Sequence, residues 1–205
     1  ERSVYTLEEA QILLDLFEQE DESNFKYVIL YTLAMYTGLR RGELLGLEWK
    51  DFDWKNCIVT ISRTSMWSKG KGIYTDTPKT KTSMRTLKLP NELLSLLQKY
   101  KAYQDDYKST LGDSWIENDR LFTQWNGKPM DMTAPYYFFQ AFCKRTGMRF
   151  VNLHSFRHFN ASVLISNGVD VKTVQSCLGH STPTTTLSIY AHAFQTTQAM
   201  AMEAV

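Results

Sequence analysis

Four short segments of the chain carry polar side chains that could act together on an anionic substrate. The first is TGLRRGELLGL, in which Arg40 precedes Glu43 by three residues, and the second is the basic stretch TPKTKTSMRTLKLP. The third is HSFRH, where His154 and Arg157 are spaced to share one face of a helix. The fourth is LGHSTPTTTLSIYAH, with a tyrosine ten residues after His180. Guanidinium and imidazole groups donate hydrogen bonds to anionic oxygens, and a tyrosine hydroxyl can act as a nucleophile.

Taken singly, these residues have ordinary structural interpretations. Arg40 could form a surface ion pair with Glu43. His154 could be a hydrogen-bonded core histidine, and His180, which follows a glycine, could cap the C-terminus of a helix. Tyr190 is one of eleven tyrosines, so its residue type alone does not identify a nucleophile. The segments therefore carry information only as a set.

The histidines and cysteines do not favour a metal site or a disulfide. No HxH, HExxH or CxxC spacing occurs, and carboxylates are scarce near the histidines. We therefore expect no metal and no other cofactor, and we expect the cysteines to be reduced. The residues considered are His154, His158, His180 and His192, and Cys57, Cys143 and Cys177.

Hydrophobic periodicity places the four segments in a mainly helical chain. Thr6 and Glu9 form the T-x-x-E pattern of a capping box, which predicts the start of a helix. Gly38, Gly168 and Gly179 are natural helix stops. Helices are predicted over residues 7–19, 24–37, 42–47, 91–100, 133–146, 155–167, 170–178 and 183–191, followed by an apolar segment over 194–205.

The pattern changes to that of strands in the middle of the chain. Three stretches, residues 58–61, 73–78 and 85–89, are separated by Gly-rich and Ser/Thr-rich turns. They predict a small three-stranded antiparallel sheet. No internal repeat and no interdomain linker is evident, so the fold class we expect is α+β, with one mainly helical domain over residues 1–205.

The composition is that of a folded protein without a membrane span. Of the 205 residues, 43% are hydrophobic, yet no apolar run reaches the roughly 18 residues that a span requires. The first residues lack a signal-peptide pattern, so we expect a cytoplasmic protein. Although the net charge is only +1, residues 62–89 hold seven basic residues and one acid, whereas residues 1–24 hold eight acids and one basic residue. This asymmetry fits one basic face and one acidic face.

Taken in order, the polar segments resemble those of the tyrosine recombinase (phage integrase) family. That family has an arginine after T-G-L with an acid three residues on, a lysine in a β-hairpin, H-x-x-R, L-G-H, and a tyrosine about ten residues later. The resemblance covers residues 5–195, and no catalytic position is missing. The matching residues are Arg40 with Glu43, Lys79, His154, Arg157, His180 and Tyr190.

The resemblance implies that these residues surround a phosphodiester. Arg40 and Arg157 would each bind the non-bridging oxygens through bidentate hydrogen bonds, a geometry that lysine cannot supply. His180 would add a further hydrogen bond, and Glu43 would hold Arg40 in its productive orientation.

The resemblance also implies how the strand is cut. Tyr190 would attack the phosphorus, His154 would help to accept its proton, and Lys79 would protonate the departing 5′ oxygen. The product would be a 3′-phosphotyrosine and a free 5′-hydroxyl, so that rejoining needs neither ATP nor a metal ion.

The basic residues around the predicted hairpin are harder to assign. Lys81 lies two residues from Lys79 and would share its face of a strand, but the family pattern of K-T before a Ser/Thr-rich stretch favours Lys79. Lys69, Lys81 and Arg85 could contact the DNA backbone or could simply be solvated charges.

Family members act on double-stranded DNA as tetramers in prokaryotic cells, and the resemblance extends these expectations to this chain. The apolar segment over residues 194–205 could dock on a neighbouring protomer or pack on its own domain. The N-terminal core-binding domain and any arm-binding domain are expected to be absent from this chain. The long basic segment is similar to that of phage and conjugative-transposon integrases.

Other functions remain open at this point. A chromosome-dimer-resolving recombinase and a type IB topoisomerase would use the same chemistry. A DNA-binding module that has lost catalysis would not need the ordered catalytic set, and a helical protein-interaction domain would not explain it.

Overall fold

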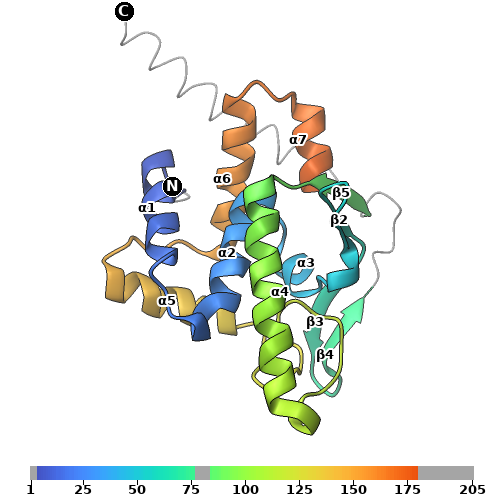
Figure 1. The fold of residues 1–205 in the computed structure, drawn as a ribbon. Coiled ribbons are helices and arrows are strands. Elements are labelled where there is room, and N and C mark those ends of the chain that lie inside the picture. The colour runs from blue at the N-terminus through green and yellow to red at the C-terminus, as the bar shows by residue number, and fades with distance from the viewer. Residues whose placement is uncertain (1–3, 77–83, 180–205) are drawn as a thin grey trace, which may run out of the picture.

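Helix α2, Phe25–Thr37, is the element around which the others pack in the computed structural model, which describes residues 4–76 and 84–179 (Figure 1). Nine of its thirteen residues are buried. A helix that is apolar on nearly every side must be covered on every side. Helices α3, α4, α5 and α6 all contact α2 and supply that cover.

Most of the described helices lie close to the positions predicted from the sequence, but the helix predicted over 91–100 continues to Leu111. The structure gives α1 Leu7–Phe17, α2 Phe25–Thr37, α3 Arg41–Leu45, α4 Asn91–Leu111, α5 Ala134–Thr146, α6 Leu153–Ser166 and α7 Val171–Leu178. Three short 3-10 helices are η1 Glu22–Asn24, η2 Trp49–Asp51 and η4 Gly112–Ser114. The helix predicted over 183–191 and the apolar segment over 194–205 lie outside the described residues.

The ends of the helices follow the predicted local signals. The backbone N–H of Glu9 donates to Thr6 Oγ1 at 3.2 Å, and the backbone N–H of Thr6 donates to Glu9 Oε2 at 2.8 Å, which completes the capping box of α1. Gly38 ends α2 with a φ of 63°, and Gly179 ends α7 with a φ of 65°. This left-handed conformation is open to glycine at little cost.

The three-stranded antiparallel sheet is confirmed, but one of its predicted members was wrong. The sheet has the order β1-β2-β5, with strands β1 Phe52–Asp53, β2 Ile58–Ile61 and β5 Arg85–Lys88. The stretch predicted near residues 73–78 is instead β4, Gly72–Asp76, and it pairs with β3, Thr64–Ser68, in a separate two-stranded hairpin.

Local pairing explains this difference. Only three residues separate β3 from β4; Gly70 in this connection has a φ of 92°, and Gly72 at the start of β4 has a φ of 68°. Closing so short a loop costs little entropy, so β4 pairs with the strand just before it. The two-residue strand β1 is too short to show an alternating pattern, which is why the sequence did not indicate it.

A small apolar cluster fixes α7 to the rest of the molecule. Ala161 of α6 and Val174 and Leu178 of α7 are fully buried against one another. Leu178 also lies against Gly38, since a Cβ built at Gly38 would meet Leu178 Cδ2 at 2.6 Å. The C-terminus of α7 is therefore held beside the C-terminus of α2.

No helix among residues 4–76 and 84–179 combines the length and the apolar character that crossing a membrane requires.

Candidate active site

Arg40 occupies the position before α3, where the chain leaves the turn at Gly38. Its extended backbone donates an N–H hydrogen bond to Glu43 Oε2 at 2.8 Å, and its Nη1 donates to Glu43 Oε1 at 3.1 Å. The side chain of Arg40 is 45% exposed, whereas that of Glu43 is 8% exposed. The carboxylate thus orients both the backbone and the guanidinium of Arg40, as the sequence predicted.

Glu43 has a second arginine partner that the sequence analysis did not identify. Nη1 and Nη2 of Arg85, at the start of β5, donate to the two oxygens of the Glu43 carboxylate at 3.0 Å each. Burial raises the pKa of Glu43, but the hydrogen bonds and charge of Arg85, together with those of Arg40, outweigh burial and hold the pKa below its usual value. Glu43 is therefore ionised at neutral pH.

Arg157 is the largest of the fully buried side chains among the described residues. It lies on α6, and its Nη1 donates to the carbonyl oxygen of Gly38 at 2.8 Å, while its Nη2 donates to that of Leu178 at 2.7 Å. Burial and, after it, the charge of Arg40 lower the pKa of Arg157 to about 9, which leaves the guanidinium protonated at neutral pH. The two carbonyl groups fix its plane.

Three arginines converge on the C-terminus of α7. Three successive carbonyl groups there, those of residues 177, 178 and 179, accept hydrogen bonds from Arg85 Nε at 2.7 Å, Arg157 Nη2 at 2.7 Å and Arg40 Nη2 at 2.9 Å. The last carbonyl groups of a helix lack partners within the helix and carry partial negative charge, so cations are stabilising there. Within the described part of the chain, Glu43 is the one carboxylate that binds these guanidiniums, and the excess of positive charge suits an anionic substrate.

His154 and Arg157 differ in exposure although they lie on the same helix. Asn152 caps α6 by accepting a hydrogen bond from the backbone N–H of Ser155 at 3.1 Å. His154, in the first turn, is exposed, whereas Arg157 is 1% exposed. The ring of His154 meets that of His158 edge to face, with centroids 4.8 Å apart.

Several predicted site residues lie outside the described residues. Lys79 and Lys81 fall between β4 and β5, His180 directly follows Gly179, and Tyr190 is ten residues further on. The structure therefore brings together Arg40, Glu43, Arg157 and the residue that precedes His180. The catalytic and DNA-binding roles of all these residues, and of His154, stay predictions.

The two remaining predicted DNA contacts, Lys69 and Arg85, have different surroundings. Lys69 is exposed in the connection between β3 and β4, where a phosphate contact is sterically open. The side chain of Arg85 is 7% exposed and donates to Glu43 and to the carbonyl oxygen of Cys177, so it is not a simple solvated charge. The hydrogen-bond acceptors of Arg85 in this structure are therefore groups inside the protein. The DNA contact considered for it stays a prediction.

Asn160 is a further site-building residue that the sequence analysis missed. Its Nδ2 donates to the carbonyl oxygens of Met35 at 3.1 Å and Tyr36 at 2.9 Å. Asn160 thus supplies hydrogen bonds to two backbone carbonyl groups in the last turn of α2. The available signal was its position three residues after Arg157, which places both side chains on one face of α6. Together they join α6 to the turn that carries Arg40.

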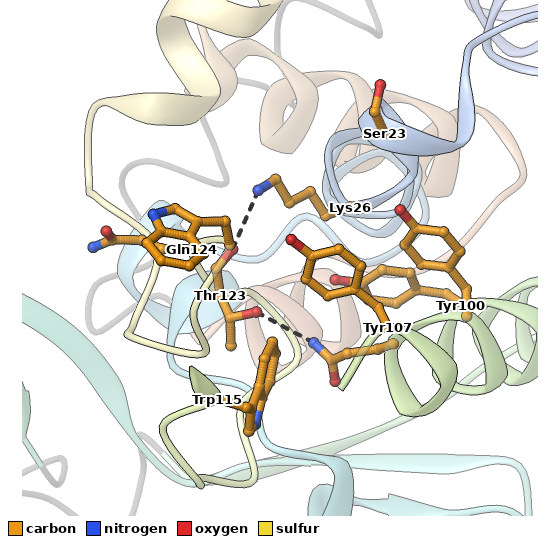
Figure 2. Close-up of a pocket in the computed structure, with 10 residues that line it drawn as sticks. Ser23, Lys26, Tyr100, Tyr107, Trp115, Thr123 and Gln124 are labelled. Atoms are coloured by element: carbon orange, nitrogen blue, oxygen red, sulfur yellow. Dashed lines mark hydrogen bonds between the residues drawn. The ribbon is translucent and has the colours of Figure 1, made fainter. Parts of the chain in front are cut away.

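A cavity of 210 Å³ lies away from these residues, near the N-terminus of α2 (Figure 2). Tyr100 and Tyr107 of α4 and Trp115 line it, and Lys26 donates to the carbonyl oxygen of Thr123 at 3.4 Å. Burial lowers the pKa of Lys26. Among the described residues, none of the predicted catalytic residues Arg40, His154 and Arg157 lines this cavity.

Comparison with known sequences identifies relatives over nearly the whole chain. A sequence profile of the phage integrase family matches residues 4–197. The ICEBs1 integrase of Bacillus subtilis (strain 168) is 34% identical over 93% of this chain and 50% of its own length. A XerC-like tyrosine recombinase of Caldanaerobacter subterraneus subsp. tengcongensis is 30% identical over 96% of this chain and 55% of its own length. The chain thus spans about half the length of these curated relatives.

Solved structures agree with the sequence comparison. The Tn1549 transposon integrase in complex with circular intermediate DNA matches with a TM-score of 0.79 and 26% identity, over 99% of this chain and 67% of that one. The catalytic domain of bacteriophage HP1 integrase shares the fold, with a TM-score of 0.59 at 18% identity, over 94% of this chain and 89% of that domain. With the family profile covering residues 4–197, the chain belongs to the phage integrase family, the tyrosine recombinases.

Proposed function

We propose that this chain is the catalytic domain of a site-specific recombinase that cuts and rejoins double-stranded DNA through Tyr190. The observation that carries the proposal is the convergence of Arg40 and Arg157 on the end of α7, immediately before His180. Its similarity to an ICEBs1 integrase and to a Tn1549 transposon integrase favours integration or excision of a mobile element in a prokaryotic cell.

The guanidiniums provide charge stabilisation that is already in place before the substrate binds. Phosphoryl transfer builds negative charge on the non-bridging oxygens of the transition state. Arg157 is held by two carbonyl groups and Arg40 by Glu43, so little reorganisation is needed when the phosphate arrives. Removing one preorganised donor of this kind typically costs about 2.7–4 kcal/mol of transition-state stabilisation.

Tyr190 supplies the nucleophile in this proposal. Its oxygen forms a bond to phosphorus while the bond from phosphorus to the 5′ oxygen breaks, and His154 helps to accept the phenolic proton. Lys79 donates a proton to the departing 5′ oxygen. The free 5′-hydroxyl, or that of a partner strand, then attacks the 3′-phosphotyrosine in the reverse sense and releases Tyr190.

Assembly of several protomers on DNA is the second part of the proposal. Recombination exchanges strands between two duplexes, and we propose a homo-tetramer that uses residues 194–205 for contacts between protomers. Deleting residues 194–205 from the full-length protein should weaken synapsis in a gel-shift assay but leave single-site binding in place. Unchanged synapsis would remove this segment from the assembly.

The covalent step can be tested directly. The full-length protein is incubated with a duplex that carries the joined ends of its element and a nick beside the cleavage position, so that the freed 5′-hydroxyl fragment diffuses away. We expect a protein–DNA adduct on a denaturing gel for the native protein and none for Tyr190→Phe, which should still bind the duplex. Binding without any adduct in the native protein would indicate a silent DNA-binding module.

A plasmid substrate separates the enzyme classes. A recombinase requires its site and more than one protomer, whereas relaxation of supercoils by a monomer on any sequence would indicate a type IB topoisomerase.

A further inference from the structure

The side chain of Arg85 is largely buried beside the candidate active site and donates its hydrogen bonds to groups inside the protein. Its side chain is 7% exposed. Nη1 and Nη2 donate to Glu43 Oε1 and Oε2 at 3.0 Å each, and Nε donates to the carbonyl oxygen of Cys177 at 2.7 Å. Three of the five N–H donors of the guanidinium are thus engaged inside the protein. The charge of Arg85 is paired with a carboxylate through both Nη groups, whereas the Nη groups of Arg157 donate to neutral carbonyl groups.

These contacts connect the two halves of the site. Glu43 is the residue that orients Arg40, and Cys177 lies in the last turn of α7, three residues before His180. The backbone of Arg85 is itself fixed, because Arg85 pairs with Ile61 in the three-stranded sheet. One side chain therefore ties the carboxylate behind Arg40 to the helix end that leads to His180.

Gly179 is packed directly against the same guanidinium. A Cβ at this position would lie 2.8 Å from Arg85 Nη1 and 3.1 Å from its Cζ, and the φ of Gly179 is 65°. Both the conformation and the lack of space favour glycine. The guanidinium of Arg85 thus limits where the backbone can run immediately before His180.

The bidentate contact of Arg85 also sets what Glu43 can offer to Arg40. Both carboxylate oxygens accept hydrogen bonds from Arg85, and the side chain of Arg40 donates one hydrogen bond, from Nη1, to Oε1. The Nη2 of Arg40 donates to the carbonyl oxygen of Gly179 at 2.9 Å. Without Arg85, Glu43 would lose its most strongly interacting cation and Arg40 would be its remaining partner.

We infer that Arg85 is a positioning residue for DNA cleavage: it acts through Glu43 and the end of α7 to place Arg40 and Gly179, and it does not itself bind DNA. This inference rests on the proposed function. It predicts that changes at Arg85 lower the rate of the chemical step and leave the affinity for DNA unchanged.

The test is single-turnover cleavage of the nicked duplex by full-length variants, with the dissociation constant for DNA measured in parallel. For Arg85→Lys we expect the cleavage rate to fall about 100-fold, because lysine cannot bind Glu43 and Cys177 together and a shift of about 1 Å in catalytic groups has an effect of this size. The dissociation constant should change by less than about twofold, since no phosphate contact is lost. Lys88→Arg is the matched control, because it exchanges the same two residue types in the reverse direction, without loss of charge, at an exposed position of the same strand.

Two further variants separate positioning from folding. In Arg85→Ala, added methylguanidinium should fill the vacated space and raise the cleavage rate toward the native value, whereas it should not restore Tyr190→Phe. The double variant Arg85→Ala with Glu43→Gln should cleave little more slowly than the slower single variant, because the two residues act as one unit.

The possible results distinguish a failure of the inference about Arg85 from a failure of the proposed function. A weaker affinity for DNA at an unchanged cleavage rate would show that Arg85 is a phosphate contact and would overturn the inference. A native rate in Arg85→Lys, or unfolding of both variants without rescue, would also overturn it. If the native protein forms no adduct at all, the proposed function fails, and this inference fails with it.

Discussion

Arg40 and Arg157 bind the same end of α7 but differ in exposure, and this difference separates their contributions. Arg157 is 1% exposed and joins the carbonyl groups of Gly38 and Leu178, so it is part of the packed interior. The side chain of Arg40 is 45% exposed, and Glu43 holds it from behind. The buried arginine therefore contributes to folding as well as to charge, whereas the exposed arginine contributes mainly to charge at the surface.

The pH dependence of stability tests the buried ion pair between Glu43 and Arg85. The pKa of Glu43 is lower in the folded protein than its usual value of 4.5. Its contribution to stability is therefore complete above the pKa of the unfolded state and is lost as the pH falls through the lower, folded-state pKa. We expect the free energy of unfolding of Glu43→Gln to fall less steeply than that of the native protein between about pH 5 and pH 3.

Urea unfolding at a series of pH values measures this difference. At pH 7 we expect Glu43→Gln to be about 3 kcal/mol less stable than the native protein, because the variant leaves Arg85 buried without its carboxylate. Glu117→Gln is the control, since its pair with Lys108 is exposed and should contribute no more than about 1 kcal/mol. Parallel pH profiles for the native protein and Glu43→Gln would contradict the account.

Sequence patterns indicated contacts between residues close in the chain better than contacts between distant residues. The spacing of Arg40 and Glu43 is local, and the structure confirms their contact. Arg85 carries the same charge in the sequence whether it faces solvent or Glu43, which lies 42 residues away. A local sequence pattern cannot indicate a partner 42 residues away, so the burial of the Arg85 side chain is evident only from the fold.

At the scale of elements, the site depends on how closely α2 and α7 end beside each other. Gly38 closes α2 at a point where a Cβ would lie 2.6 Å from Leu178 Cδ2 and 3.0 Å from Asn160 Oδ1. Gly168 has a similar positive φ of 79°, but nothing lies within 4 Å of its Cβ position. The two glycines thus share the same backbone requirement and differ in packing.

This contrast predicts unequal effects of substitution by alanine. Both Gly38→Ala and Gly168→Ala should lose about 1–2 kcal/mol from the left-handed backbone. Gly38→Ala should lose about 1–3 kcal/mol more, because the added methyl group must displace the neighbouring side chains. Chemical denaturation of both variants measures the difference, and equal losses would mean that the two helix ends are not tightly packed.

The elements themselves were predictable to different degrees. Glycine stops and the capping box define helix ends locally, and α1, α2 and α7 follow them. The sheet was predicted with the right number of strands but with a wrong member, because strand pairing depends on loop closure as well as on alternation. The hairpin of β3 and β4 is the result of that local closure.

At the scale of the whole molecule, the uneven charge distribution bears on DNA binding. Residues 1–24 hold eight acids, whereas residues 62–89 hold seven basic residues. Lys69 is exposed between β3 and β4 within the basic region. If it contacts a phosphate, its removal should weaken binding to all DNA sequences alike.

The salt dependence of affinity tests this contact. For Lys69→Ala in the full-length protein, the slope of log Kd against log salt concentration should fall by about one. Lys101→Ala is the control, because Lys101 is paired with Asp105 at 2.7 Å on α4. Fluorescence anisotropy at several salt concentrations gives both slopes, and an unchanged slope for Lys69→Ala would show that this residue does not bind a phosphate.

The central claim, covalent cleavage through Tyr190, is tested most directly by locating the bond. The adduct formed on the nicked duplex is digested with trypsin and nuclease and analysed by mass spectrometry. No lysine or arginine follows Lys172 up to residue 205, so the tryptic peptide that begins at Thr173 contains Tyr190 as its only tyrosine over that range. We predict a nucleotide on this peptide, attached to Tyr190, in the native protein and in the control Tyr137→Phe, which changes an exposed tyrosine. A nucleotide on any other residue, or an adduct that persists in Tyr190→Phe, would contradict the account.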